Sequence, residues 1–126
     1  MNRFTLFSLF LLFSFFSGCT GLKLDYGDPA AQFVEEDVAT KGKDFLSKII
    51  TVKGTVTKVD VSDPKAAKVF LQHGIQCNLG KLTRMAESCQ VGETVYVDGK
   101  LTVCEEGNII LDPASKRDPN AKFEPK

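Results

Sequence analysis

The chain has 126 residues, and its 16 basic and 16 acidic side chains give a formal net charge of zero at pH 7. No field of one sign is present to attract a polyanion, which disfavours a nucleic-acid partner. The length suits a single compact domain and excludes a second one of ordinary size.

The first nineteen residues predict export. Asn2 and Arg3 precede an apolar run over residues 4–16, which is too short to span a bilayer comfortably. This order is typical of a secretory signal peptide. Phe16-Ser17-Gly18-Cys19 resembles the lipobox of bacterial lipoproteins, with Phe16 where an aliphatic residue is usual. The resemblance implies cleavage before Cys19 and attachment of diacylglycerol and palmitate there; an ordinary secretory peptide cut nearby is the alternative.

Residues 1–18 are therefore expected to be a lipoprotein signal peptide and residues 19–27 a short tether. Cleavage leaves 108 residues and removes one basic side chain, so the net charge becomes −1. We expect a membrane-anchored lipoprotein of the bacterial cell envelope, facing the periplasm or the cell exterior. Thr20 after the cysteine, in place of Asp, favours the outer membrane if the organism is Gram-negative.

A helix is predicted from Asp28, where Asp is a good N-cap and Pro29 suits the first helical position. Its apolar side is formed by Phe33, Val34 and Val38, and Lys41-Gly42-Lys43 supplies a basic end and a breaker. The acidic triplet Glu35, Glu36 and Asp37 is interpreted as a solvated helix face.

From Ile49 the period changes to two, which predicts a long half-buried strand through Thr57. The inward set is Ile50, Val52, Gly54 and Val56. Gly54 within this strand indicates a bend or a bulge.

Further elements follow in regular order. They are a loop over residues 60–67, a strand over 68–72, a turn at 73–74, a strand over 75–79, a short helix over 81–88, a strand over 94–103, a turn over 105–108, a strand over 109–111 and a flexible tail over 113–126.

This order predicts an all-β domain with minor helices, over residues 28–112. Specifically, we expect a five-stranded OB-fold Greek-key barrel, preceded by an N-terminal helix, with a short helix between its third and fourth strands. Residues 32–113 resemble the bacterial tRNA-anticodon-binding-like OB-fold family, which has exported and lipoprotein members. The resemblance is carried by Ile50–Val56, Val69–Leu71, Ile75–Cys77, Val91–Gly99 and Gly107–Leu111. It implies the fold and transfers no ligand.

OB-folds bind ligands on the outer face of their second and third strands, between the loop joining strands one and two and the loop joining strands four and five. Strand alternation predicts a polar outer face with one central aromatic ring; the ring is expected either to stack a ligand or to be buried under the leading helix or the tail. Tyr96 is a second candidate platform. The candidate binding face comprises Lys53, Thr55, Phe70, Gln72, Gln76 and Asn78.

Three cysteines remain beside Cys19, and an oxidising compartment predicts one disulfide among Cys77, Cys89 and Cys104 without choosing the pair. No metal or cofactor is expected, because no C-x-x-C pair is present and His73 is the sole histidine. Common catalytic constellations also lack parts, so we expect no enzyme.

These observations predict an extracytoplasmic OB-fold binding module, anchored to the membrane through Cys19, whose ligand is an envelope protein, a peptide or a glycan. Two alternatives stay open: a single-stranded nucleic-acid-binding OB domain and an exported thiol or redox protein. The sequence does not determine the oligomeric state.

Overall fold

The computed structural model describes residues 28–126. The expected signal peptide, Cys19 and the tether lie outside the described residues. Within residues 28–126, no helix combines the length and the apolar composition that crossing a membrane requires.

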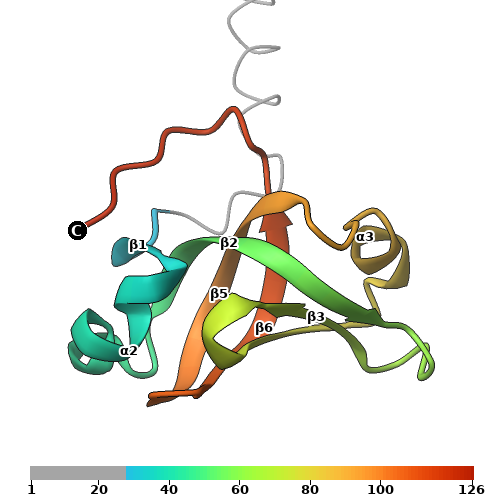
Figure 1. Cartoon of the computed structure of the whole chain (residues 1–126), viewed down its shortest axis with the longest axis horizontal. Helices are drawn as coiled ribbons and strands as arrows, with labels where there is room; N and C mark the ends of the chain where they lie inside the picture. Colours follow the sequence, from blue (N-terminus) through green and yellow to red (C-terminus); the bar gives the residue numbers. More distant parts are fainter. Residues whose placement is uncertain (1–27) are drawn as a thin grey trace, which may run out of the picture.

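Five strands close into a barrel (Figure 1). The neighbour order is β2-β3-β4-β6-β5, and β5 returns to pair with β2. The β4–β6 pair is parallel and the other pairs are antiparallel. The predicted all-β, OB-like barrel is therefore confirmed. The strands are β2 (Ile49–Asp60), β3 (Ala67–Leu71), β4 (Ile75–Gly80), β5 (Thr94–Glu105) and β6 (Asn108–Arg117).

The long strand β2 closes the barrel by pairing with β5 along its first half and with β3 along its second half. Residues 49–55 pair with β5, and residues 56–60 pair with β3. Between Val56 and Lys58 the register with β3 shifts by one residue, as in a β-bulge. Bulges bend a strand, so this one helps β2 to turn from one neighbour to the other.

The core lies inside the barrel, because alternate residues of each strand point inward. Short helix α3 (Thr83–Glu87) contributes Ala86, which is fully buried. The largest side chains of the core are Phe33, Ile50, Ile75, Leu101, Ile109 and Leu111.

The helix predicted from Asp28 is wrong in its first part. Residues 31–34 form strand β1 (Ala31–Val34), which pairs in parallel with β2. Helical turns begin only afterwards, in η1 (Glu35–Asp37), α2 (Val38–Lys41) and η2 (Lys43–Phe45). Phe33 is buried in the core as a strand residue. Pairing with a strand distant in sequence outweighs the local N-cap signal.

The tail expected from residue 113 is also wrong in its first part. β6 continues through Arg117, and Ala114 and Ser115 are buried against β5. Residues 118–126, here called the C-terminal segment, then cross back to β1, as Figure 1 shows in red. The proline-rich composition predicts a departure from the barrel, whereas the backbone stays in contact with it.

Candidate ligand-binding face

The outer surface of β3 and β4 carries a row of side chains across the barrel. Phe70 is opposite Lys58 of β2 on one side and Gln76 of β4 on the other. Gln76 is in turn opposite Ile110 of β6. Because Val69 and Leu71 are buried, Phe70 points outward, where it is half-buried. Its side chain lines a hollow of the surface, and Lys58 Nζ lies 5.5 Å from the centroid of its ring.

Three polar side chains beside Phe70 are linked by hydrogen bonds. Gln76 Nε2 donates to Asn78 Oδ1 at 2.7 Å, and Asn78 Nδ2 donates to Asp112 Oδ2 at 3.0 Å. These bonds fix the orientation of two amides and one carboxylate on the outer surface. A face with fixed amide and carboxylate directions can select hydrogen-bond donors and acceptors of a ligand.

Two neighbouring hollows lie along this face. The first has a volume of about 490 Å³ and is bordered by the β3–β4 turn, by Gly107 of the β5–β6 turn and by Asn108 at the start of β6. Phe70, Gln72 and Gln76 line it. The second, of about 260 Å³, is lined by Asn78, by Asp112 and by residues 65–68 of the β2–β3 connection and β3. The face thus lies between the β2–β3 connection and the β5–β6 turn, which correspond to the two loops that frame ligand sites in OB-folds.

The structure brings four of the six predicted face residues together and separates two. Lys53 and Thr55 lie in the first half of β2, opposite Tyr96 and Thr94 of β5. They line a different hollow, together with Glu35 and Glu36. The prediction that they share the Phe70 face is therefore wrong, because this half of β2 pairs with β5, and only the residues from Val56 onward pair with β3.

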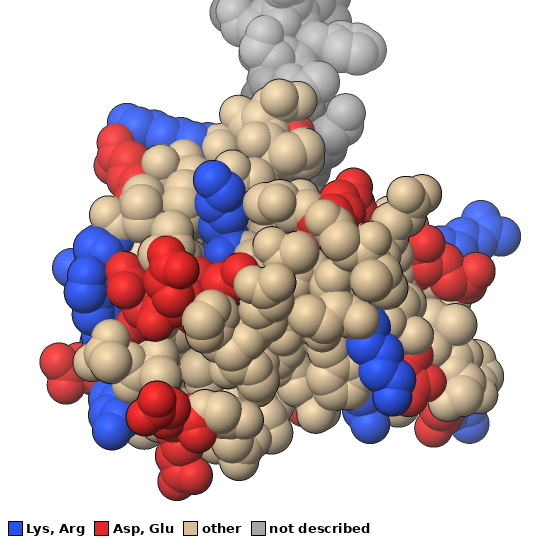
Figure 2. All heavy atoms as spheres, viewed as in Figure 1, with Lys and Arg blue, Asp and Glu red and all other residues tan. Residues whose placement is uncertain are grey.

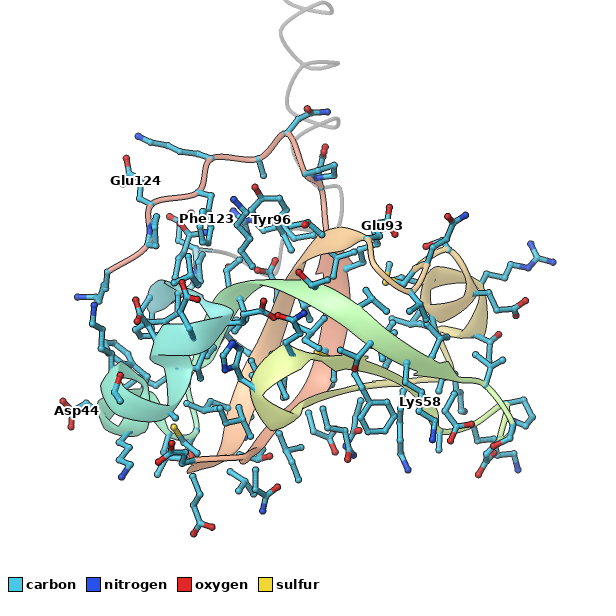
Figure 3. All side chains as sticks on the ribbon, in the orientation of Figure 1. Asp44, Lys58, Glu93, Tyr96, Phe123 and Glu124 are labelled. Atoms are coloured by element: carbon cyan, nitrogen blue, oxygen red, sulfur yellow. The ribbon has the colours of Figure 1, made fainter. Side chains whose placement is uncertain are left out.

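Tyr96 does not offer a free stacking platform. Its ring is in edge-to-face contact with Phe123 at a centroid separation of 5.2 Å, and Lys53 Nζ lies 5.8 Å from it. Figure 3 shows Tyr96 and Phe123 together beneath the C-terminal segment and far from Lys58. The Tyr96 region is consequently separate from the Phe70 face.

Two members of the face, Lys58 and Asp112, are not predicted from the sequence. Strict alternation after Val56 places Lys58 inside the barrel, whereas the bulge turns Lys58 outward beside Phe70. Thr57 supports the irregular backbone, because its Oγ1 donates to the Phe70 carbonyl at 3.2 Å. The sequence predicts that the domain ends at Asp112, whereas Asp112 is a β6 residue whose carboxylate accepts a hydrogen bond from Asn78.

Glu35 also departs from the solvated triplet that was expected. Its Oε2 accepts a hydrogen bond from the Thr55 backbone N–H at 3.0 Å, and the residue is half-buried. Glu36 in the same triplet is exposed, as predicted.

The disulfide predicted among Cys77, Cys89 and Cys104 is not formed, because all three are buried free thiols. Burial raises the pKa of all three thiols above the ordinary value. A raised pKa lowers the thiolate fraction, which is the reactive form, and so disfavours the redox interpretation. Within residues 28–126, no cluster of three or more His, Cys, Asp or Glu side chains is suited to hold a metal ion.

Charges of both signs are interspersed on the surface seen in Figure 2. Near the face, Asp60 accepts two hydrogen bonds at the start of the β2–β3 connection. Ser62 donates from both its hydroxyl and its backbone N–H to Asp60 Oδ1. These hydrogen bonds from Ser62 lower the pKa of Asp60, which keeps a negative charge beside Lys58 and Lys68.

Comparison with known proteins leaves the family unassigned. No family model matches this chain, and no curated protein matches it. Among solved structures, the chain is similar to a "putative nucleic acid-binding lipoprotein" from Klebsiella pneumoniae subsp. pneumoniae MGH 78578. The TM-score is 0.46 and the identity 14%, over 66% of this chain and 81% of that chain.

Proposed function

We propose that this protein is a binding module of the bacterial cell envelope, anchored by lipid on Cys19, and that it acts by binding and not by catalysis. Its ligand is an envelope protein, a peptide or a glycan, held on the Phe70 face. The observation that carries the proposal is the half-buried Phe70 ring beside the hydrogen-bonded chain of Gln76, Asn78 and Asp112. An apolar surface next to a few oriented polar groups is the usual composition of a ligand site.

The shape of the face supports an extended ligand. Two hollows follow one another along β3 and β4, from the β5–β6 turn to the β2–β3 connection. A sugar ring or an apolar side chain packs on Phe70, and the next unit of the ligand reaches Asn78 and Asp112. Stacking on one aromatic side chain contributes about 1 to 3 kcal/mol in the analogous case of a nucleic-acid base.

A photocrosslinking experiment in the native envelope tests this function. A photoreactive amino acid at Gln72, which is exposed and lines the larger hollow, should give discrete crosslinked products. Adding Phe70→Ala should remove those products, because it removes the stacking surface without changing the position of the probe. The same photoreactive group at Glu93, which Figure 3 places elsewhere on the surface, is the matched control. Identical products from Gln72 and Glu93, or products that survive Phe70→Ala, contradict the proposal.

Single-stranded nucleic acid is the second candidate, favoured by Lys58 over the Phe70 ring and by Lys68 next to Asn78. Asp60 and Asp112 oppose it by adding negative charge to the same region. The test is binding of a single-stranded oligonucleotide at low salt. If this binding weakens steeply with added salt and disappears in Phe70→Ala, it establishes the second candidate over the first. Absence of binding at low salt would dismiss it.

A further inference from the structure

The C-terminal segment is held against β1 in the manner of a bound peptide. The side chain of Gln32 contacts two backbone groups of the segment: its Nε2 donates to the Lys122 carbonyl at 3.4 Å, and its Oε1 accepts from the Glu124 N–H at 2.7 Å. The Gln32 carbonyl accepts from the Lys126 N–H at 2.9 Å. One β1 residue therefore contacts alternate backbone positions of an extended chain, as in recognition of a peptide at a sheet edge.

An aromatic side chain fixes the position of the segment along the surface. Phe123 is half-buried against Tyr96, with ring centroids 5.2 Å apart and planes at 69°. At the end of the segment, Lys126 Nζ lies 5.5 Å from the Phe45 ring centroid. Figure 3 shows Phe123 turned inward from the segment toward Tyr96. Backbone contacts are independent of sequence, so Phe123 is the selective element of this contact.

The segment fills its binding site incompletely. A groove of about 320 Å³ remains between it and residues 28–32 at the start of β1, and Arg117 also lines this groove. The Arg117 Nε is buried and has no hydrogen-bond partner. Most of the segment is exposed, including Lys122, Glu124 and Lys126. A longer or bulkier peptide can therefore occupy groove volume that the segment leaves open.

We propose that the surface formed by Gln32, Tyr96 and Arg117 is a second binding site, specific for an extended peptide of another protein with one aromatic side chain, and that the C-terminal segment occupies it in competition with that peptide. The site lies apart from the Phe70 face and does not depend on the function proposed for that face. The partner's aromatic ring takes the place of Phe123 on Tyr96, and its backbone takes the contacts of Gln32.

The C-terminal segment competes strongly with an external peptide because it is covalently linked to the domain that carries the site. A short tether gives the C-terminal segment a local concentration in the millimolar range, so an intermolecular peptide binds the unmodified protein weakly. Loosening the segment without altering the site should therefore strengthen binding of the external peptide.

The nonapeptide of residues 118–126, labelled with a fluorophore, is a suitable probe, because its binding mode is known from the intact chain. We expect the full chain with Phe123→Ala to bind this peptide at least tenfold more tightly than the unmodified full chain does, as measured by fluorescence anisotropy. Asn120→Ala is the matched control, because it truncates an exposed side chain of the same segment outside the Gln32 contacts and the groove while keeping Phe123. It should leave the affinity at the level of the unmodified protein.

Two further variants test the site itself. Adding Tyr96→Ala or Gln32→Ala to Phe123→Ala should abolish the gain, and a peptide with alanine in place of Phe123 should not bind. Circular dichroism verifies that each variant is folded. In the unmodified protein, millimolar peptide should shift the NMR signals of the Gln32 side-chain amide and of the Tyr96 ring. Equal affinity of the peptide for the unmodified and Phe123→Ala proteins, or no shift at Gln32 and Tyr96, overturns the proposal.

Discussion

Gly54 lies in β2 at a point where a side chain has almost no room. A Cβ added there would lie 2.6 Å from Glu35 Oε2 and 2.9 Å from Leu71 Cδ1. The glycine is not needed for a left-handed backbone, since the positive-φ glycines among the described residues are at other positions. Close packing of η1 and β3 against β2, and not a strained turn, explains this residue.

We therefore expect Gly54→Ala to lower the free energy of unfolding by about 1 to 3 kcal/mol, the usual cost of overpacking. The added methyl group pushes the Glu35 carboxylate away and weakens its hydrogen bond with the Thr55 N–H. Urea unfolding followed by circular dichroism measures the effect.

A double-mutant cycle identifies the cause. In a Glu35→Ala background the nearest conflicting atom is absent, so Gly54→Ala should cost less there than in the unmodified chain. Additive effects of the two substitutions would show that Glu35 is not the reason for the glycine.

For single residues, the direction of a side chain could be predicted wherever the strand is regular. Alternation places Phe70, Gln76 and Asn78 correctly, because β3 and β4 pair without interruption over these positions. It fails for Lys58, because a bulge inserts one residue and reverses the parity after Val56. Nothing in the residues around Thr57 marks that insertion in the sequence.

Among the elements, the hairpin of β3 and β4 and the long strands β2 and β5 could be predicted because their patterning is local. β1 could not, since a four-residue strand pairs with β2 nearly twenty residues later, while Asp28 and Pro29 carry a strong local helix signal. The end of β6 escaped prediction for a related reason. Pro113 lies where the register between β5 and β6 shifts, a position that tolerates the missing N–H.

The last part of β6 is fixed to the barrel by a largely buried ion pair. Arg117 Nη1 donates to Asp98 Oδ2 of β5 at 2.9 Å, and the Thr51 hydroxyl of β2 donates to the other oxygen of that carboxylate. Asp98 is only 8% exposed. The interaction joins three strands at the point where the barrel closes.

Arg117→Met should lower the free energy of unfolding by about 3 kcal/mol or more, because it leaves the buried Asp98 carboxylate without its cation. Lys116→Met, one residue earlier in β6, should change it by less than about 1 kcal/mol. Combining Arg117→Met with Asp98→Asn should recover part of the loss, since the uncompensated charge is then gone. A loss in Arg117→Met no greater than in Lys116→Met, in urea unfolding, would contradict the assigned role.

For the whole molecule, the two candidate binding surfaces occupy different parts of the domain's surface. The Phe70 face uses the outer surface of β3 and β4, and the second site uses β1, Tyr96 and Arg117. The barrel could be predicted from strand order, whereas the second site depends on the C-terminal segment, whose composition alone indicates no docking place. A protein with two such surfaces can hold two ligands at once, provided that it is in the compartment where both occur.

That compartment is tested by Cys19→Ser. The substitution removes the only thiol of the lipobox-like motif, so the chain should no longer receive a lipid and should move from the membrane to the soluble fraction after export. Membrane fractionation with metabolic labelling by a radioactive fatty acid measures both effects. Cys104→Ser, which changes a buried thiol of β5, is the matched control. This variant should keep its label and stay with the membrane. If Cys19→Ser remained in the membrane fraction, or if the unmodified protein took up no label, another feature would have to anchor the chain.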